Sequence, residues 1–588
     1  MTKMKWMACL LIATACGGPS AELMIDTVAT DDSALLTAGE SMVSEGDYEP
    51  AAVEDSADVA PGSEAVAPSA ICSTDTRMPA ACAFDASPIG AVTFGHVPAP
   101  RAPCNPLTET VVTPSDTASL QARINALPRR NLCFRSGRYN LARALNVNAG
   151  QTLRAESNVV LSGSVSVTGF GTGKQATLDL PTAPTFSSQV DCDHTPLVCG
   201  GRGTYSGVCG ESNDVYVNGN PLKRVGLTAM PGAGEYQVAR LGGNRVRITL
   251  GTAPGASNVT IASTAQAVKL TGAAAVIDGF IIEQFANPSD VGAVVVSGND
   301  AKVMNTEVRH THATGIQVIN AARAQLVNNN LHHNGQVGAQ VYLASQTEIS
   351  GNTIEANNAF GYCRIDGAAG GLKVVDSAAT LVSLNDVKDN LAVGVWFDRD
   401  NKGGTITRNL IRNSFSDGVR FEISSGAKID HNVVVRNALG SPSVRGGQHH
   451  ANLGAGITLH NANGGCVYRN ILVDNLNGVA LISRSRTFVR GGTSFLAPNL
   501  QNVGVYDNAM SLKKAPVTMA PQETGIYYAA SSAVPSPYLP STKVVFFRNS
   551  YTLESFSAAH FKWTTYVTSA QWKSAPASQD ACSTFVDG

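Results

Sequence analysis

The sequence has few charged residues and, after its first residues, no long apolar run. Charged side chains make up only 15% of the 588 residues, whereas glycine occurs 56 times. This composition favours many turns and few exposed helices. No later apolar run is long enough to cross a bilayer. The chain also lacks a phosphate-binding loop, another nucleotide-binding motif or a Ser/His/Asp signature, so we expect neither nucleotide chemistry nor a nucleic-acid partner.

The first residues have the layout of a secretion signal. Lys3 and Lys5 precede a short apolar run and then small residues up to Cys16. That run is too short for a permanent membrane span. Residues 13–16, "ATAC", resemble a bacterial lipobox, in which the cysteine is lipidated and becomes the new N-terminus. We therefore expect a lipoprotein signal peptide over residues 1–16 and export to the bacterial cell envelope through lipidated Cys16, with ordinary cleavage and secretion as the alternative.

Residues 17–70 contain no Lys or Arg but 12 acidic residues. Such a segment cannot bury enough apolar surface to fold, so it is expected to be a disordered tether. The remaining body, residues 71–588, has 41 basic and 33 acidic residues, a difference of +8. This surplus weakly favours anionic partners.

Ten cysteines follow Cys9 and Cys16. An even number in an exported chain predicts disulfides. Cys192, Cys199 and Cys209 form a cluster, but they lack the paired Cys-x-x-Cys spacing of zinc sites. A disulfide is therefore favoured there, and no metal site is assigned.

A short motif recurs along the middle of the chain. Residues 394–398 read GVWFD, and residues 418–422 read GVRFE. Eight glycines open such runs: Gly292, Gly315, Gly338, Gly371, Gly394, Gly418, Gly456 and Gly478. The successive steps are 23, 23, 33, 23, 24, 38 and 22 residues. Alternation of apolar residues with period two inside each run predicts a strand.

A second periodic column consists of asparagines. Each follows a short strand signal, as in "TITRN" and "KIDHN". The column comprises Asn329, Asn352, Asn385, Asn409, Asn432, Asn470 and Asn508. Asparagine suits a recurring corner because it tolerates left-handed backbone geometry, and stacked amides can hydrogen-bond along a ladder. Two or three strand signals per period predict a solenoid whose stacked turns share one core.

In these features the sequence resembles the right-handed parallel β-helix superfamily, which has the pectin-lyase-like fold. The resemblance covers residues 135–550 and implies an all-β solenoid. It implies no single activity, because this fold hosts many.

The flanking segments are expected to close the solenoid. Residues 71–134 form the predicted N-terminal cap, because "SDTASLQARINALP" places Leu120, Ile124 and Leu127 at helical spacing. Such a helix would cover an open sheet end that otherwise invites aggregation. Residues 551–588 resemble the closing cap of secreted bacterial members, which carry a similar Trp and Asp. The period is lost between about 187 and 268, where antiparallel strand signals predict an inserted β module.

The repeat also predicts which side chains face outward. The first and third residues after each glycine are apolar and should enter the core, so the second and fourth should point out. One outward column holds Gln317, Gln340, Lys373, Trp396, Arg420 and Thr458; the other holds Tyr342, Val375, Asp398, Glu422 and His460. Since neighbouring strands lie about 4.8 Å apart, we expect Asp398 and Glu422 to be side by side on an exposed sheet.

This cluster has the composition of a sugar-cleaving site. Trp396 can stack on a sugar ring, and Asp398 and Glu422 can divide the work of acid and nucleophile or base. Repulsion between two close acids is expected to raise one pKa. The outward acids could equally be solvated members of surface ion pairs, such as Lys373 with Asp398 or Arg420 with Glu422.

Three insertions are expected to form the walls of a binding cleft over this cluster. "AFGYCRIDGAAG" precedes Lys373, "LGSPSVRGGQHHANLGAG" precedes His460, and residues 483–500 follow on the other side. Long loops beside a rigid sheet commonly build binding clefts. The further substrate-binding candidates are Gln340, Tyr342, Asp366, His449, His450 and His460.

Three functions remain open. The first is a glycoside hydrolase that uses Asp398 and Glu422. The second is a polysaccharide lyase or epimerase on uronic-acid glycans; lyases of the resembled superfamily use a Lys or Arg base with calcium, which implies Lys373 or Arg420 as the base and possible Ca²⁺ on the two acids. The third is a non-catalytic glycan-binding or adhesion solenoid, which a lipid anchor would suit.

Four histidines stand apart from the cleft. His310 and His333 occupy equivalent turn positions, with His312 and His332 nearby. Without a carboxylate at ligand spacing they are interpreted as solvated turn residues rather than as metal ligands.

Overall fold

The computed structural model describes Pro79, Cys82 and residues 92–98, 100–181, 211–363, 368–439, 454–490, 493–513, 522–529, 535–580 and 582–588. The expected signal peptide, Cys16, the acidic tether and the cysteines of the 192–209 cluster lie outside these residues. No helix of the described part is long and apolar enough to cross a membrane.

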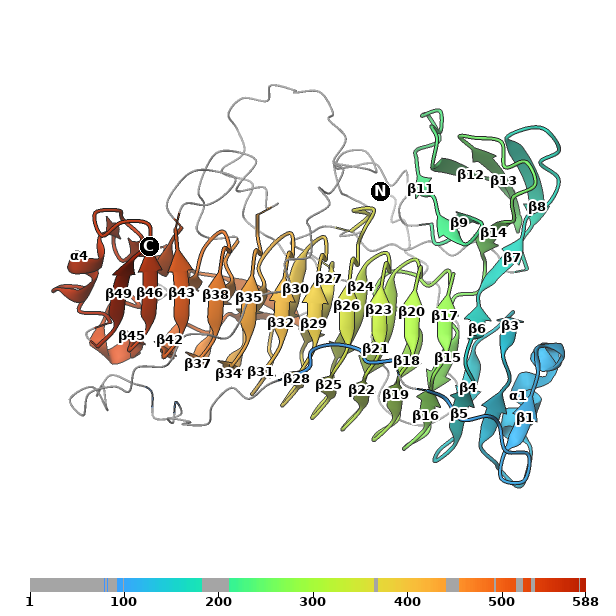
Figure 1. Ribbon diagram of the computed structural model, residues 1–588, viewed down its shortest axis with the longest axis horizontal. Helices are drawn as coiled ribbons and strands as arrows, with labels where there is room; N and C mark the ends of the chain where they lie inside the picture. The colour runs from blue at the N-terminus through green and yellow to red at the C-terminus, as the bar shows by residue number, and fades with distance from the viewer. Residues whose placement is uncertain are drawn as a thin grey trace, which may run out of the picture. The chain divides into compact units, whose positions relative to one another are not determined.

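Three sheets of 13 strands each build the solenoid, and each rung between residues 132 and 562 contributes one strand to sheet A, then one to sheet B and one to sheet C (Figure 1). Sheet A contains β1 (Thr110–Val112), β2 (Leu132–Phe134), β5 (Thr152–Ala155), β16 (Val276–Asp278), β19 (Lys302–Met304), β22 (Gln325–Val327), β25 (Glu348–Ser350), β28 (Leu381–Ser383), β31 (Thr405–Thr407), β34 (Ser425–Asp430), β37 (Asn463–Tyr468), β42 (Gln501–Tyr506) and β45 (Val544–Phe547).

Sheets B and C repeat the same stacking order. Sheet B contains β3 (Gly137–Asn140), β6 (Val159–Ser162), β17 (Ile281–Glu283), β20 (Glu307–Arg309), β23 (Asn330–His332), β26 (Thr353–Glu355), β29 (Asp386–Lys388), β32 (Leu410–Arg412), β35 (Val433–Val435), β38 (Ile471–Val473), β43 (Ala509–Leu512), β46 (Ser550–Leu553) and β49 (Thr584–Asp587). Sheet C contains β4 (Leu145–Val147), β15 (Val268–Leu270), β18 (Gly292–Val296), β21 (Thr314–Ile319), β24 (Val337–Tyr342), β27 (Gly370–Val375), β30 (Val393–Phe397), β33 (Val419–Glu422), β36 (Ile457–His460), β39 (Val479–Ser483), β44 (Thr524–Tyr528), β47 (Phe561–Lys562) and β48 (Tyr566–Val567). Pairing between rungs is parallel except for β47 with β48, so the predicted all-β parallel β-helix is confirmed.

The core lies inside the solenoid and follows the predicted alternation. Val395, Phe397, Val419 and Phe421 are completely buried, and Phe397 stacks on Phe421 with ring centroids 5.5 Å apart. These residues belong to one cluster that runs through successive rungs. Each rung therefore buries its apolar face only because the next rung covers it.

The glycine and asparagine columns lie at different corners, and each has its own physical cause. A Cβ atom at Gly418 would lie 2.9 Å from Nδ2 of Asn437 and 2.7 Å from the carbonyl oxygen of Gly456, closer than side-chain carbons pack. At another corner, Asn385 Nδ2 donates to Asn409 Oδ1 at 2.9 Å, and Asn409 repeats this bond to Asn432. Glycine thus leaves room for corner amides, whose ladders satisfy buried backbone groups.

The ends of the solenoid are covered by short helices. A 3-10 helix, η3 (Pro114–Ser119), leads into α1 (Leu120–Asn125), and Leu120 and Ile124 are buried against the first rungs as predicted. Leu127, predicted to share that face, is 81% exposed because the helix ends at Asn125. At the other end, α4 (Ser569–Lys573) buries Trp572, whose indole donates to Asp580 at 2.8 Å.

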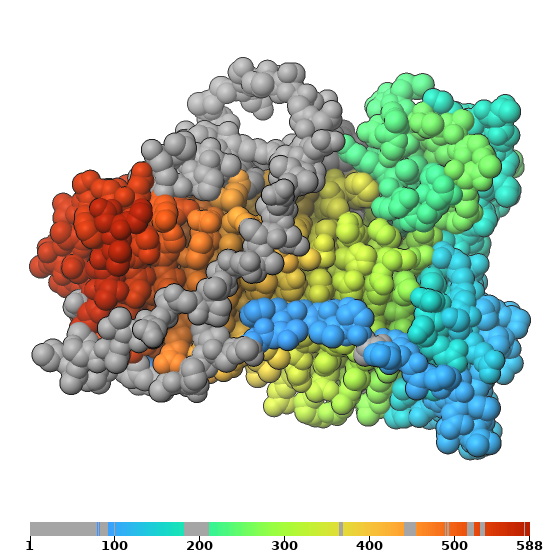
Figure 2. All heavy atoms as spheres, viewed as in Figure 1, coloured from blue at the N-terminus to red at the C-terminus, as the bar shows by residue number. Residues whose placement is uncertain are grey.

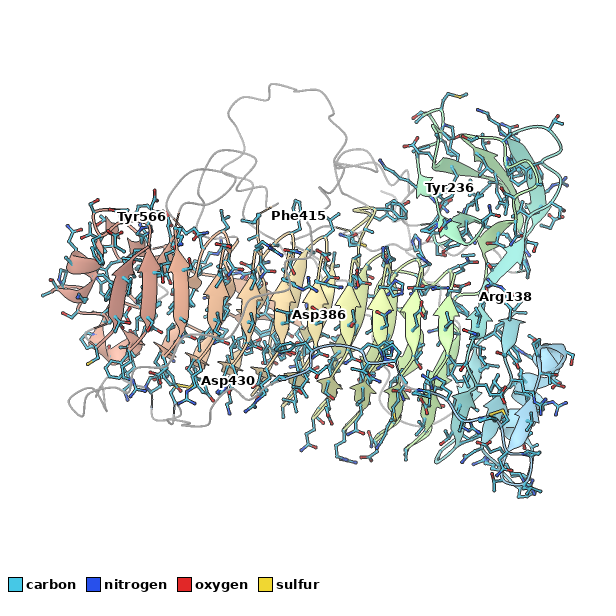
Figure 3. All side chains as sticks on the ribbon, in the orientation of Figure 1. Arg138, Tyr236, Asp386, Phe415, Asp430 and Tyr566 are labelled. Atoms are coloured by element: carbon cyan, nitrogen blue, oxygen red, sulfur yellow. A yellow bond between two sulfur atoms is a disulfide. The ribbon has the colours of Figure 1, made fainter. Side chains whose placement is uncertain are left out.

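The inserted module consists of two four-stranded sheets around their own apolar cluster. The strands are β7 (Ser164–Ser166), β9 (Val215–Val217), β10 (Asn220–Pro221) and β14 (Val259–Ala262), and β8 (Gln175–Asp179), β11 (Lys223–Arg224), β12 (Glu235–Gly242) and β13 (Arg245–Leu250). The module starts earlier than its expected boundary, because β7 and β8 pair with strands of the module. Tyr236 lies in its interior (Figure 3) and donates to Asp214 at 2.9 Å.

An N-terminal segment and disulfides fasten the rungs. Residues 92–98 lie along the corner between sheets A and B, where Gly95 N–H donates to Leu384 O and His96 N–H to Thr353 Oγ1 (Figure 2). Disulfides join Cys104 with Cys133 and Cys82 with Cys466. Cys363 and Cys582 each take part in a disulfide as well, so the prediction of disulfides is confirmed.

A hairpin of β40 (Thr487–Arg490) and β41 (Thr493–Leu496) forms a separate unit, with Phe488 stacked on Phe495. A further 3-10 helix, η4 (Pro540–Thr542), precedes β45.

Candidate functional site

The register of sheet C brings the predicted residues onto one outward face. Gln340, Lys373, Trp396, Arg420 and Thr458 are paired in succession from β24 to β36. In the neighbouring column, Glu422 pairs with His460, and Tyr342 pairs with Val375. Asp398 follows Phe397, the partner of Phe421, and is therefore level with Glu422 on the adjacent rung.

An aromatic ring lies between two cations at the centre of this face. Lys373 Nζ lies 4.1 Å from the centroid of the Trp396 ring, and the Arg420 guanidinium carbon lies 5.1 Å from it. Because a cation is attracted to the face of an aromatic ring, the ring holds both side chains in place. One rung on each side of Trp396 therefore supplies a positive charge.

The two predicted acids have different partners. Asp398 Oδ2 accepts from Lys373 Nζ at 3.1 Å, and its side chain is 21% exposed. Glu422 Oε1 accepts from the Trp396 indole at 2.8 Å, and its Oε2 lies 3.5 Å from His460 Nδ1. The geometry thus confirms adjacent rungs and one common face, while each acid is held by its own donors.

The expectation that this sheet face is openly exposed is wrong. Trp396 is 3% exposed, Glu422 4% and His460 3%. Their outward direction is correct, and Lys373 and Arg420 lie over the Trp396 ring. Of the two acids, Asp398 keeps the more accessible side chain. The expected surface pair of Arg420 with Glu422 is replaced, because Arg420 bonds Asp417.

Asp417 is a residue that sequence reasoning missed. Its Oδ2 accepts from Arg420 Nε at 2.7 Å, and its Oδ1 accepts from Ala455 N–H at 2.7 Å and the Thr458 hydroxyl at 2.8 Å. It is fully buried and fixes Arg420 over Trp396. The signal was readable: the other residues directly before the eight repeat glycines are uncharged, and Asp417 is the exception.

Further charged residues join the same network. Asp376 accepts from Arg399 Nε at 3.3 Å. The two residues are 23 positions apart, which is one period of the repeat, so this ion pair joins adjacent rungs. Arg484 Nε donates to His460 Nε2 at 2.8 Å, which places the imidazole proton on the Nδ1 that faces Glu422. Arg484 follows β39 and is not part of the repeat, so no periodic signal identified it.

A buried carboxyl lies farther along sheet C. Glu523 precedes β44, is 7% exposed and accepts from the Tyr527 hydroxyl at 3.3 Å. Burial raises its pKa to about 7, against 4.5 for an ordinary glutamate. The register of β39 with β44 puts Gly478 at the equivalent position of the preceding rung, so the sequence carried no acidic pair to mark it.

The remaining candidates divide into described and undescribed positions. Gln340 Oε1 accepts from Gln317 Nε2 at 2.9 Å, which continues the polar column beyond Lys373. Tyr342 is half-buried at the end of β24. Asp366, His449 and His450 lie outside the described residues.

The four turn histidines are not all solvated, as the sequence suggested. His312 is buried, and its Nδ1 lies 2.9 Å from Asp214 Oδ2 of the inserted module. Burial and the neighbouring His333 lower the pKa of His310 to about 4, and burial lowers that of His333. The carboxylate that the sequence lacked at this corner comes from a segment about 100 residues away.

Within the described residues, one set of three potential metal ligands has its atoms within 4.8 Å of one another: Cys104, Cys133 and Glu156. The two sulfurs form a disulfide, and Glu156 accepts from Cys104 N–H at 2.7 Å. Thiolates are the form that binds metal, so this set is structural.

Comparisons with known proteins agree with the architecture. Residues 291–452 match the family model described as "Right handed beta helix region". No curated protein matches the chain. The chain is similar to the structure titled "The complex structure of XylC with xylose", with a TM-score of 0.47 and 11% identity over 82% of this chain and 86% of that one.

Two other similar structures differ in their stated roles. The A-module of the mannuronan C-5 epimerase AlgE6 of Azotobacter vinelandii has a TM-score of 0.41 and 10% identity over 82% of this chain and 96% of that one. PfbA, a surface adhesin of Streptococcus pneumoniae, has a TM-score of 0.34 and 10% identity over 66% of this chain and 99% of that one. These likenesses concern the fold, which is a right-handed parallel β-helix, and no activity follows from them.

Proposed function

We propose that this right-handed parallel β-helix protein is a polysaccharide-active enzyme, and that it is a glycoside hydrolase with Asp398 and Glu422 as the carboxyl pair. The observation that carries the proposal is their position on adjacent rungs of sheet C, beside the Trp396 indole. Neighbouring strands lie about 4.8 Å apart, close to the roughly 5 Å between the carboxyl groups of retaining glycosidases.

The two environments suit different steps. Glu422 accepts a hydrogen bond from the indole and faces His460, so it is oriented as the nucleophile. It would attack the anomeric carbon while Asp398, the more exposed acid, gives a proton to the leaving sugar oxygen. Water then hydrolyses the glycosyl–Glu422 ester, and Asp398 takes a proton from that water. The Lys373 ammonium group, which is paired with Asp398, must move away from this carboxyl and toward the substrate before Asp398 can transfer a proton.

A lyase or epimerase on uronic-acid glycans is the second candidate. It is favoured by the two cations at Trp396, since Lys373 and Arg420 suit the carboxylate of a uronic acid. In that reaction one of them removes the proton next to the carboxylate, and the other neutralises its charge. In a lyase the bond to the leaving sugar oxygen then breaks and that oxygen takes up a proton, whereas in an epimerase a proton returns to the same carbon on the opposite face. Lys373 pairs with Asp398 and the Trp396 indole donates to Glu422, so both acids have partners other than calcium in this version.

The proposal also includes the cellular location of the enzyme and the charge of its substrate. The lipobox-like "ATAC" and the acidic segment 17–70 support a lipid-anchored protein on the bacterial cell envelope. The surplus of 41 basic over 33 acidic residues in the body supports an anionic polysaccharide.

The test is to incubate the full chain with neutral and uronate-containing polysaccharides and to record three readouts. Hydrolysis releases reducing ends without ultraviolet absorption, elimination creates an absorbing unsaturated sugar, and epimerisation changes the proton NMR spectrum alone. For a hydrolase, Asp398→Asn and Glu422→Gln should each lower kcat by roughly 10²–10⁴-fold. Lys373→Met should only weaken a hydrolase but abolish a lyase that uses this lysine as base.

Glu355→Gln is the matched control. Glu355 accepts from Lys388 at 3.2 Å, an ion pair like that of Asp398 with Lys373, but it lies on sheet B. Loss of this ion pair in Glu355→Gln should leave kcat unchanged. If no glycan is altered but some are bound, and binding falls in the sheet C variants, the protein is a glycan-binding solenoid and the enzyme proposal is wrong.

A further inference from the structure

Three imidazoles gather at the corner that follows β20 and β23, away from the proposed catalytic face. The ring centroids of His310 and His333 are 5.7 Å apart, those of His310 and His332 6.2 Å, and those of His332 and His333 5.1 Å. The stacking of rungs creates this triangle, because His310 and His333 are equivalent residues one rung apart.

These distances suit a metal ion. With zinc–nitrogen bonds of about 2.1 Å, tetrahedral ligation places imidazole centroids about 5 Å apart. His332 Nδ1 and His333 Nδ1 already lie 2.9 Å from each other. His310 Nδ1 is buried without a hydrogen-bond partner among the described residues. The three rings do not yet have all ligand atoms within 4.8 Å, so the His310 ring must turn to complete the set.

The surroundings provide what a histidine site needs. Glu307 Oε1 lies 3.2 Å from His332 Nε2, the nitrogen that does not face His333. A carboxylate on the far nitrogen orients a metal-binding imidazole and increases its basicity. Arg309 is close, but it is paired with Glu283 and Glu307.

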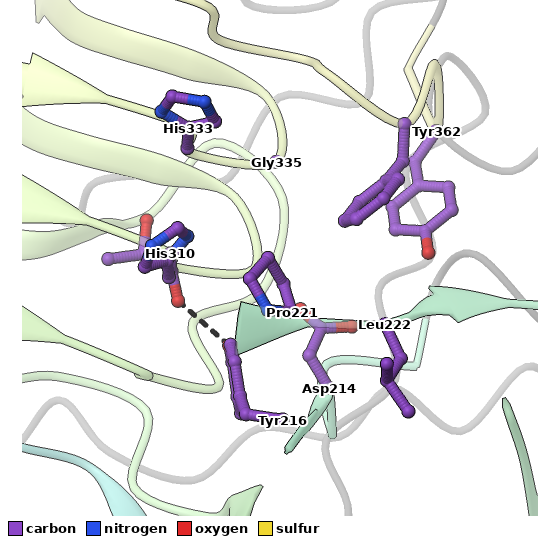
Figure 4. Close-up of a pocket in the computed structure, with 10 residues that line it drawn as sticks. Asp214, Tyr216, Pro221, Leu222, His310, His333, Gly335 and Tyr362 are labelled. Carbon is purple, nitrogen blue, oxygen red and sulfur yellow. Dashed lines mark hydrogen bonds between the residues drawn. The ribbon is translucent and has the colours of Figure 1, made fainter. Parts of the chain in front are cut away.

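A water molecule also fits beside two of the three rings. His310 and His333 line a pocket with Asp214, Tyr216 and Tyr362 (Figure 4). Its cavity of about 20 Å³ can hold one water molecule. Three histidines and a water complete a four-coordinate zinc site.

We propose that His310, His332 and His333 bind a divalent transition-metal ion, with Zn²⁺ as the ion that best suits three imidazoles and one water. The inference does not depend on the proposed catalytic function. The metal would join two rungs at the corner where the inserted module contacts the solenoid through Tyr216 and His310.

The test is a Zn²⁺ titration of the full chain, purified without a histidine tag and stripped with a chelator, by calorimetry and by metal analysis after dialysis. We expect one ion per chain. His332→Asn and His333→Asn should each weaken binding by more than roughly tenfold, and Glu307→Gln by roughly tenfold. Asparagine is chosen because His333 has a φ of 55°, a left-handed conformation that asparagine tolerates.

His96→Asn is the control, since His96 lies on the N-terminal segment and bonds Asn328 O. It should bind Zn²⁺ like the wild type. Co²⁺ bound to the wild type should give the visible absorption of a tetrahedral site, a readout that needs no variant to fold. Absence of Zn²⁺ binding, or equal binding by wild type and the His332→Asn, His333→Asn double variant, would overturn the proposal.

Discussion

The corner ladder between sheets B and C has a gap at Ser414, and filling it should stabilise the protein. Asn357 Nδ2 donates to Asn390 Oδ1 at 2.9 Å, and beyond the gap Asn437 donates to Asn475 in the same way. At the rung between them the serine hydroxyl is buried and has no hydrogen-bond partner in the described structure. We therefore predict that Ser414→Asn raises the free energy of unfolding.

The site has the space that asparagine requires. Gly394 faces Ser414, and a Cβ at Gly394 would lie 2.7 Å from the serine Oγ. The corresponding distances from Gly371 to Asn390 Nδ2 and from Gly418 to Asn437 Nδ2 are 2.8 and 2.9 Å. Gly394 thus lies against Ser414 as the neighbouring glycines lie against Asn390 and Asn437, and it leaves the same space beside the corner.

The magnitude follows from the bonds gained. An asparagine in the ladder geometry accepts from the amide of Asn390, donates to Asn437 Oδ1 and donates to a core carbonyl, as Asn390 does to Ile354 O at 2.9 Å. Three bonds of about 0.5–1.5 kcal/mol each, less about 1 kcal/mol for ordering the side chain, leave about 0.5–3.5 kcal/mol.

Urea unfolding monitored by circular dichroism measures the effect as a higher midpoint at an unchanged slope. Ser414→Leu is the control, because leucine has a shape similar to asparagine but forms no hydrogen bond; it should destabilise. If Ser414→Asn is neutral or as harmful as Ser414→Leu, the ladder does not contribute the stability assigned to it.

Two further predictions concern burial and cross-linking. Because burial raises the pKa of Glu523 to about 7 from 4.5, the native chain takes up this proton at a higher pH than the unfolded chain. Its contribution to stability is therefore full below pH 4.5 and is lost as the pH rises through 7, by up to about 3 kcal/mol. Urea midpoints measured from pH 4.5 to 8 should fall less steeply for Glu523→Gln, and parallel slopes would contradict this assignment. Replacing Cys82 and Cys466 by alanine opens a bridge between residues 384 positions apart and should lower the free energy of unfolding by about 3–5 kcal/mol. The same urea titration checks it, with the oxidised wild type as reference; an unchanged midpoint would show that the N-terminal segment gains nothing from this anchor.

The repeat was predictable because its cause is local in each rung. Gly394 and Gly418 leave space for corner side chains, and Val395 and Phe397 alternate with outward residues. Outside the two insertions each requirement recurs every 22–24 residues, so it appears in the sequence as a period. The same period correctly placed Asp398 beside Glu422 and Trp396 beside Lys373.

Contacts that break the period were not predictable. Arg484 reaches His460 from outside the repeat, and Asp214 of the inserted module meets His312. The burial of Trp396 was missed as well, because alternation gives the direction of a side chain but not what lies on it. Asp417 could have been noticed in the sequence as the one charged residue in its column. That it holds Arg420 became clear only from the hydrogen bond that Arg420 Nε donates to Asp417 Oδ2.

The sequence by itself therefore determined the solenoid, its register and the two outward columns. Every rung needs glycine beside its corner and apolar residues that alternate with outward ones, so stacking makes this pattern recur along the chain. Only the tertiary structure decided which donors hold Glu422, how far the sheet C face is covered, and that three imidazoles converge at one corner. Those outcomes depend on side-chain length, rotamer and the return of distant segments, which no periodic pattern encodes.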